Sequence, residues 1–140
     1  MKVKLLVTLC LSAQIYSSGF NDNDGAPIRQ GVHIEWYRTI APGYSGEGIF
    51  VWSDTRYGMR NIFAHKIDQD GNLLWGEEGT VVTDLPGRQE DPVAITDGAG
   101  GAFIAWVDYR FDAQGDIFLQ HVDNTGEIND CNKVLLNRSI

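Results

Sequence analysis

The chain has 140 residues, of which 43% are hydrophobic and 21% are charged, and its formal net charge is −8 at pH 7. This composition is typical of one globular domain with a buried core, and it excludes a long disordered chain. Because an acidic surface repels phosphate backbones and anionic lipid, the charge argues against nucleic acid and membrane surfaces as partners.

The first 19 residues have the order of a secretory signal peptide. Two lysines stand within the first four positions, residues 5–11 are almost wholly apolar, and residues 12–19 are mostly small or polar. The apolar run is too short to span a bilayer, so we expect no integral membrane span. Cleavage after Ala13 and cleavage after Gly19 both remain open. A lipoprotein anchored at Cys10 is the weaker alternative, since the preceding residues make a poor lipobox.

These features predict a protein that is exported, either to the extracellular space or cell surface or, as the alternative, to the periplasm. Removal of residues 1–19 would take away two lysines and no acid, which changes the net charge from −8 to −10. It would also leave Cys131 as the sole cysteine, so we expect no disulfide within the mature stretch. Residues 20–30 are predicted to be a leader that precedes the first folded element.

Residues 31–84 contain four predicted strands in succession. The ranges are 31–38 (GVHIEWYR), 48–52 (GIFVW), 61–68 (NIFAHKID) and 81–83 (VVT). A loop at 41–48 joins the first two, and we expect it to be longer than its counterpart in the second half of the chain. A glycine-containing turn of hairpin type follows the third strand at 68–72.

Residues 85–140 contain a second predicted set of four strands. The ranges are 92–96 (PVAIT), 102–107 (AFIAWV), 116–123 (DIFLQHVD) and 134–136 (VLL), with turns at 97–101 and 123–126. The strands at 48–52 and 102–107 are apolar on both faces, which predicts that each is covered on both sides.

The two halves repeat one pattern with a period of 54 or 55 residues. The matched positions of the first half are Trp52, Asp54, Arg56, Asp68 and Gly71, and those of the second half are Trp106, Asp108, Arg110, Asp123 and Gly126. Repetition at this spacing is typical of solenoids and propellers, because each unit must stack on the next in the same way.

Four short antiparallel strands with apolar central members are typical of one propeller blade. We therefore expect an all-β fold of two four-stranded β-propeller blades, 31–84 and 85–140, that belong to an incomplete ring. The alternative is a β-sandwich of about seven strands, which accounts for the turns but gives no reason for the repeat.

The motifs W-x-D-x-R and D-x-x-G occur twice in the same order over residues 28–130, and between them stand NIF at 61–63 and DIF at 116–118. In this they resemble the blades of large secreted bacterial propeller proteins, many of which carry a C-terminal type IX sorting domain and some of which have adhesion modules. The resemblance implies a binding, adhesion or scaffolding module of a larger protein, with the remaining blades of that protein as partners. The second unit departs from the pattern at 129–132 (NDCN), where the first has LLWG. It therefore has no tryptophan to take the packing role that we expect for Trp75 in the first unit.

The Asp54–Arg56 and Asp108–Arg110 pairs are the most prominent charges. Because they recur at the same place in both units, they indicate a structural ion pair or turn cap more than a ligand site. The alternative function is part of a sialidase-like glycoside-active propeller enzyme, in which arginines hold a substrate carboxylate. The chain has no nucleophile elbow, P-loop or dinucleotide-binding signature, so we predict no catalytic residue and no cofactor.

Metal binding is not predicted either. Residues 22–25 (DNDG) and 68–71 (DQDG) resemble the opening of a calcium loop, but neither loop has the glutamate that supplies the bidentate ligand at its twelfth position. His33, His65 and His121 stand at unmatched positions of their strands and show no metal-ligand spacing.

Four aromatic residues stand in or near predicted loops, and they are Trp36, Tyr44, Tyr57 and Tyr109. If the protein binds a carbohydrate or a protein ligand, these flat rings with polar tips would form the platform. Packing at the edge of the sheets is the alternative reading of each.

Overall fold

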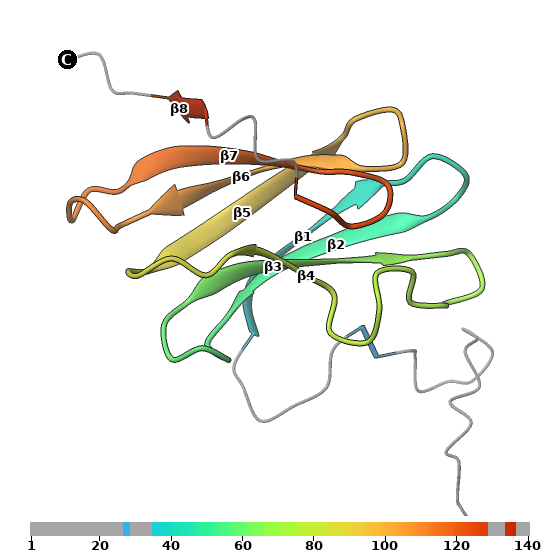
Figure 1. Cartoon of the computed structure of the whole chain (residues 1–140), viewed down its shortest axis with the longest axis horizontal. Coiled ribbons are helices and arrows are strands. Elements are labelled where there is room, and N and C mark those ends of the chain that lie inside the picture. Colours follow the sequence, from blue (N-terminus) through green and yellow to red (C-terminus); the bar gives the residue numbers. More distant parts are fainter. Residues whose placement is uncertain (1–26, 29–34, 129–133, 137–140) are drawn as a thin grey trace, which may run out of the picture.

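The computed structural model describes residues 27–28, 35–128 and 134–136, and these form an all-β fold of two antiparallel sheets (Figure 1). Sheet 1 consists of β1 (Glu35–Pro42), β2 (Gly48–Asp54), β3 (Asn61–Ile67) and β4 (Thr80–Thr83). Sheet 2 consists of β5 (Gln89–Thr96), β6 (Ala102–Asp108), β7 (Asp116–Val122) and β8 (Val134–Leu136). In both sheets the spatial order equals the chain order, so each strand pairs with the one that follows it.

The two sheets repeat each other in register. Trp52 of β2 pairs with Phe63 of β3, and Trp106 of β6 pairs with Phe118 of β7. Both first strands also carry a register shift at the same place, between Trp36 and Thr39 in β1 and between Glu90 and Val93 in β5. The sequence repeat therefore corresponds to a structural repeat, down to the irregularity.

The core lies between the sheets, which are stacked face to face with β5 against β1, β2 and β3 (Figure 1). Sheet 1 contributes small and β-branched residues, namely Ala41, Ile49, Val51, Ile62, Ala64 and Val82, together with Trp75 from the segment before β4. Sheet 2 contributes Ala102, Ile104, Trp106, Phe118 and Val122. At the junction, the aromatic and large apolar residues of sheet 2 thus pack against the smaller and β-branched residues of sheet 1.

The central strands of the two sheets are not covered equally. All residues of β3 are buried, and β2 is buried at most positions on both faces. In β6, by contrast, buried residues alternate with exposed or half-buried ones. The expectation that both apolar central strands are covered on two sides is therefore right for sheet 1 and wrong for sheet 2, because no part of the described chain lies against the far face of β6.

Several predicted boundaries shift in the structure. The first two residues of the predicted long loop at 41–48 belong to β1, and the loop that remains, 43–47, is as long as its counterpart at 97–101. Strand β5 begins at Gln89, three residues before the predicted start, because Gln89 and Glu90 pair with the end of β6. The predicted start of β1 at 31–34 lies outside the described residues.

The signal peptide, the leader up to residue 26, the loop at 22–25, His33 and Cys131 also lie outside the described residues. The division of the chain at residue 84 stays a prediction. Over the part of the chain that the structure describes, no helix is long and apolar enough to cross a membrane.

Candidate functional site

The repeated W-x-D-x-R motif forms a closed cluster at the end of β2. The indole Nε1–H of Trp52 donates to Asp54 Oδ2 at 3.0 Å, and Arg56 Nη2 donates to the same oxygen at 2.6 Å. The backbone N–H of Arg56 donates to Asp54 Oδ1 at 2.9 Å, which caps the turn. The Arg56 guanidinium also covers the ring of Phe63, with Cζ 3.8 Å from the ring centroid. All these groups are thus engaged with one another.

The same cluster occurs at the end of β6. Trp106 Nε1–H and Arg110 Nη2 donate to Asp108 Oδ2 at 3.2 and 2.7 Å, and the Arg110 N–H donates to Asp108 Oδ1 at 3.0 Å. Arg110 Cζ lies 4.2 Å from the centroid of Phe118. Because both arginines are tied to an aspartate two residues earlier, neither is aimed at a common point as a substrate clamp would require.

Asp54 and Asp108 are fully buried, which makes their partners essential. Burial by itself raises the pKa of Asp54, but the hydrogen bonds from Arg56 and Trp52 together outweigh it and hold that pKa below its ordinary value. The carboxylate therefore stays ionised in the folded protein and acts as the structural centre of the motif.

At the opposite end of the strands, three turns are closed by one device. Asp68, Asp97 and Asp123 each donate a backbone N–H to the carbonyl four residues on, at 3.1, 3.1 and 3.0 Å. Their Oδ1 atoms accept from the N–H groups two and four residues on, at 2.7–3.1 Å. Gly71 and Gly126 have φ of 84° and 87°, which a residue with Cβ rarely adopts. The repeated D-x-x-G positions are thus turn formers.

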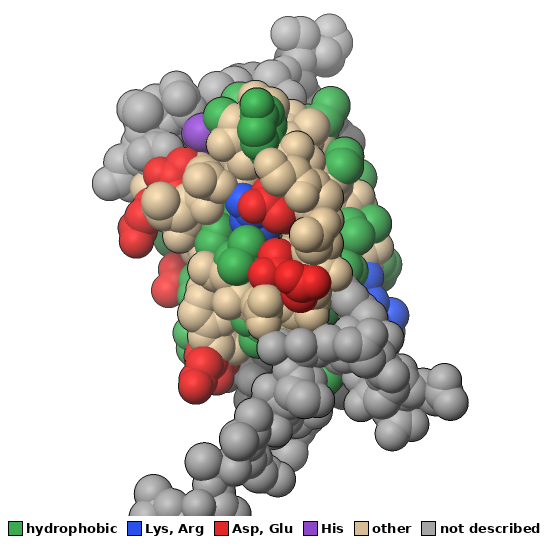
Figure 2. All heavy atoms as spheres, turned by 90° about the vertical axis from the view of Figure 1, so that its right-hand side faces the viewer, with side chains coloured by type: hydrophobic (Ala, Val, Ile, Leu, Met, Phe, Trp, Pro, Cys, Tyr) green, Lys and Arg blue, Asp and Glu red, His purple; other side chains and the backbone are tan. Residues whose placement is uncertain are grey.

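Hydrogen bonds make these turn carboxylates more acidic. The Asn72 side chain lowers the pKa of Asp68, and the Thr125 side chain lowers the pKa of Asp123. Acidic side chains are spread over this end of the molecule, with basic atoms between them (Figure 2). The acids at this end are Asp68, Asp70, Asp97, Asp123 and Glu127 of the three turns and Glu47 of the β1–β2 loop. Among the described residues, however, no three His, Cys, Asp or Glu side chains are placed to hold a metal ion.

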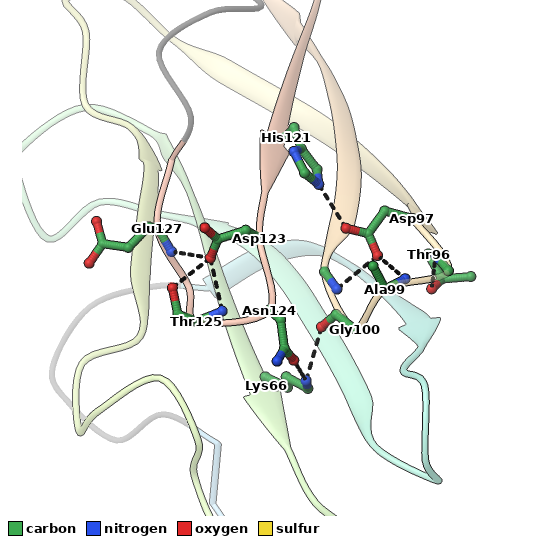
Figure 3. A network of polar contacts seen from close by, with 12 residues as sticks. Lys66, Thr96, Asp97, Ala99, Gly100, His121, Asp123, Asn124, Thr125 and Glu127 are labelled. Atoms are coloured by element: carbon green, nitrogen blue, oxygen red, sulfur yellow. Dashed lines mark hydrogen bonds and ion pairs between the residues drawn. The ribbon is translucent and has the colours of Figure 1, made fainter.

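Lys66 of β3 joins the two sheets at this end (Figure 3). Its buried ammonium group donates to the Gly100 carbonyl at 2.9 Å and to Asn124 Oδ1 at 2.6 Å, both in sheet 2. It also lies 3.2 Å from Glu47 Oε2 in its own sheet. A lysine in a buried strand is stable only when paired in this way, so the junction is specific as well as apolar.

At the other end, cationic and aromatic side chains alternate across both sheets. We name them the arginine–aromatic strip, and its members are Trp36, Arg60, Glu90, Arg88 and Tyr109. Arg60 Cζ lies 4.5 Å from the Trp36 ring centroid, and Arg88 Cζ lies 4.0 Å from that of Tyr109. Glu90 stands between the arginines, paired with Arg60 and 3.5 Å from Arg88 Nε. Trp36 and Arg88 remain exposed, so the strip offers an aromatic and charged surface to solvent.

Strained backbone lies next to this strip. Tyr37 and Asp91 occupy the bulges of β1 and β5 and have φ of 45° and 50°. This region costs a non-glycine residue about 1–2 kcal/mol, so the neighbouring contacts must hold it. A bulge re-aims the side chains beside it, and here it lets the exposed ring of Tyr37 lie 6.0 Å from Arg60 Cζ.

The repeat is not kept at the strip. Trp36 and Tyr37 of sheet 1 correspond to Glu90 and Asp91 of sheet 2, at the same positions of the two bulges. Residues that fold a repeat must recur, whereas residues that contact a ligand are free to differ from unit to unit. The strip is therefore the best candidate for a ligand contact in the described chain.

A cavity of about 230 Å³ lies between β4 and strands β6 and β7. Its walls contain three polar groups with no hydrogen-bond partner, namely Thr83 Oγ1, Arg110 Nε and Gln120 Oε1. These atoms are closed to solvent, so they do not face the open space of the cavity. The cavity gives no evidence for a bound ligand.

The structure separates the four predicted aromatic platform residues. Trp36 and Tyr109 belong to the strip, and Tyr57 lies in the β2–β3 loop with its ring 5.8 Å from Phe63. Tyr44 stands in the β1–β2 turn at the acidic end, so it does not share a platform with Trp36. Sequence reasoning missed Arg60, Arg88 and Glu90, because nothing in their local sequence shows that the start of β5 brings them together.

Comparison with known proteins adds no further constraint. No protein-family model matches the chain, and no curated protein and no solved structure matches it either.

Proposed function

We propose that this chain is an exported binding module, built of two β-propeller blades of a larger cell-surface or secreted assembly, that recognises a carbohydrate through the arginine–aromatic strip. The observation that carries the proposal is the contrast between two sets of residues. The W-x-D-x-R groups repeat and are satisfied internally, whereas the strip does not repeat and is open to solvent.

The propeller reading is supported by the arrangement of the sheets. Each has four antiparallel strands in chain order, and the first strands β1 and β5 lie side by side, as the inner strands of neighbouring blades do. The aromatic-rich face of one sheet packs on the smaller residues of the other, which is a relationship that a further blade could continue.

The chemistry of the strip suits a sugar. An indole ring and a phenol ring offer flat apolar surfaces, while two guanidinium groups and one carboxylate offer donors and acceptors for hydroxyl groups. No observation favours the sialidase-like alternative, because the arginines it would use, Arg56 and Arg110, are held by Asp54 and Asp108.

The test is a titration of the purified chain with a panel of neutral and acidic oligosaccharides, followed by NMR chemical shifts and Trp fluorescence. We expect the signals of Trp36, Tyr109 and their neighbours to shift, and Trp36→Ala and Tyr109→Ala to weaken binding at least tenfold. Tyr44→Ala is the matched control at the other end of the sheets. Shifts confined to the acidic end, or a protein ligand that competes at the strip in place of sugars, would contradict the proposal.

A further inference from the structure

We propose that the ligand of the arginine–aromatic strip is an acidic saccharide, whose carboxylate binds to Arg88 while a sugar ring lies on Trp36. This inference rests on the proposed function, because it takes the strip to be a carbohydrate site and names the class of sugar. It assigns to Arg88 the choice between acidic and neutral saccharides.

The charges of the strip do not cancel. Glu90 is buried, and its Oε1 contacts Arg60 Nη1, so these two residues form a locally neutral pair. Arg88 approaches the other oxygen of Glu90 only through Nε, at 3.5 Å, and one carboxylate cannot balance two guanidinium groups. Asp91 is the exposed acid on the adjoining bulge, but within the described part of the chain no ion pair links it to Arg60 or Arg88. One positive charge therefore remains, and it lies on Arg88.

The Arg88 side chain is held in one orientation. The Tyr109 N–H donates to the Arg88 carbonyl at 2.9 Å, and the Arg88 guanidinium covers the Tyr109 ring, with Cζ 4.0 Å from the ring centroid. The ring itself is confined, because a Cβ at Gly115 would stand 3.0 Å from Tyr109 Cε1. With Nε next to Glu90, the terminal nitrogens Nη1 and Nη2 have no acceptor among the described residues, and the side chain is 48% exposed.

This free edge of the guanidinium determines which ligand group fits. Two parallel N–H donors in one plane match the two oxygens of a carboxylate. A hydroxyl group offers one oxygen and no charge, so it gains less from the same edge. Uronic acids and related sugars carry a carboxylate on a ring that also has an apolar face.

A surface for that apolar face lies next to the free edge. The Trp36 ring is 39% exposed and lies 4.5 Å from Arg60 Cζ. Arg60 and Arg88 contact the two oxygens of the same Glu90 carboxylate, so the indole and the free guanidinium edge are neighbours. A short acidic oligosaccharide would therefore contact both groups at once.

The acidity of the whole chain does not exclude an anionic ligand. The net charge is −8, but charges that are more than about 8 Å apart are largely screened at physiological ionic strength. The acids of the three aspartate turns lie at the opposite end of the strands. The charge of Arg88 is therefore the one that the ligand meets at the strip.

The test compares saccharides that differ in charge, titrated into the purified chain at physiological ionic strength and followed by NMR and calorimetry. Oligogalacturonate and its methyl ester form one pair, and the oligoglucuronate of cellulose-type linkage and the cello-oligosaccharide form another. We expect the acidic member of at least one pair to bind at the strip about tenfold more tightly than the neutral member, as one charge-assisted hydrogen-bonded contact would give.

Variants of the chain separate the roles of the two residues. Arg88→Gln should reduce the affinity for the acidic member to that for the neutral one, and Arg88→Lys, which keeps the charge without the two-donor edge, should restore only part of the difference. Trp36→Ala should weaken both members by the same factor. Arg38→Gln removes the same charge from an exposed arginine outside the strip, so this matched control should change neither affinity. Circular dichroism checks that each variant keeps the fold.

Two results would overturn this inference and leave the carbohydrate function intact. They are equal affinities for the acidic and neutral members at the strip, and a preference for the acidic member that survives Arg88→Gln. A preference confined to sulfated oligosaccharides over their desulfated forms would also overturn it, because a carboxylate would then not be the group that binds. If no saccharide of either kind shifts the signals of Trp36 and Tyr109, the proposed function and this inference are both wrong.

Discussion

Lys66 and His121 occupy the same position in β3 and β7, and the side chain of each contacts a carboxylate in the turn before the second strand of its sheet. Lys66 Nζ lies 3.2 Å from Glu47 Oε2. His121 Nε2 lies 2.7 Å from Asp97 Oδ2, as Figure 3 shows. The repeat thus keeps the pair while it exchanges both partners. Lys66 differs in that it also reaches the neighbouring sheet, and this difference leads to the first prediction.

Replacement of Lys66 by Met should destabilise the fold by about 2–4 kcal/mol, because the buried Gly100 carbonyl and Asn124 side chain lose their charged donor. His121→Gln is the matched control, since its pair lies nearer the surface and should cost less than about 1 kcal/mol. Urea unfolding followed by Trp fluorescence measures both. Equal losses in the two variants would show that the bridge between the sheets contributes little.

The W-x-D-x-R cluster should be critical for stability in both sheets. Asp54→Asn and Asp108→Asn remove a buried negative charge and take from Arg56 and Arg110 the carboxylate that holds each guanidinium at 2.6 and 2.7 Å, so we expect each to cost about 3 kcal/mol. The free energy of unfolding from chemical denaturation is the readout. A change below about 1 kcal/mol in both variants would contradict a structural role and would reopen a ligand role for these pairs.

Gly126 should be intolerant of any side chain. A Cβ at this position would stand 2.8 Å from Trp75 Cγ, and φ is also in the left-handed region. Gly98 has a similar φ but open space around it, so Gly98→Ala measures the backbone strain alone, about 1 kcal/mol. We expect the thermal midpoint of Gly126→Ala to fall clearly further than that of Gly98→Ala. Similar midpoints would mean that Trp75 does not pack against this turn.

As the pH falls, His65 should lower the free energy of unfolding at a higher pH than the carboxylates do. Burial lowers the pKa of His65 below its ordinary value of 6.5, and its hydrogen bond to the Gly76 carbonyl offsets this only in part. The unfolded chain therefore takes up a proton near pH 6.5 that the folded chain resists, and stability falls as the pH drops below that value, by at most about 1.4 kcal/mol per pH unit.

The matched variant is His65→Gln, because Gln120 occupies this position in sheet 2. The free energy of unfolding, measured between pH 7.5 and pH 5, should decline less steeply in the variant than in the wild type. An unchanged slope would exclude His65 as the source. A further decline near pH 4 and below is expected in both proteins, since Asp54, Asp68 and Asp123 have pKa values below those of the unfolded chain.

Local sequence patterns predict much of the fold. The apolar runs, the Asp and Gly turn residues and the internal repeat predict seven strands that lie close to those observed, and an eighth, β1, whose predicted range overlaps the observed one. The predicted strand boundaries are wrong where pairing with a strand distant in the sequence determines the structure. Gln89 and Glu90 appear polar and loop-like, yet they are buried because Asp108 and Val107 pair with them across the sheet.

The sites were harder to predict. Lys66 appears in the sequence as an ordinary charge on a strand, and its burial depends on Asn124, 58 residues away. The alignment of Lys66 with His121 was the available signal, since it marks one strand position that carries a nitrogen-bearing side chain in both units. Nothing comparable marks Arg60 and Arg88, which meet at Glu90 only after β5 has stacked on sheet 1.

Each strand of this protein pairs with its neighbour in the chain, so a stretch of about 50 residues contains its complete hydrogen-bond ladder. Contacts of short sequence separation form quickly, and each sheet should be able to assemble before it meets the other. The same property makes the four-stranded sheet a suitable unit of gene duplication, because a copy can be gained or lost without breaking the hydrogen-bond ladder of another sheet. What such an event must keep is the match between faces, and Trp52 and Trp106, with their aspartates and arginines, stand at the same places of the two sheets, whereas the residues of the arginine–aromatic strip differ.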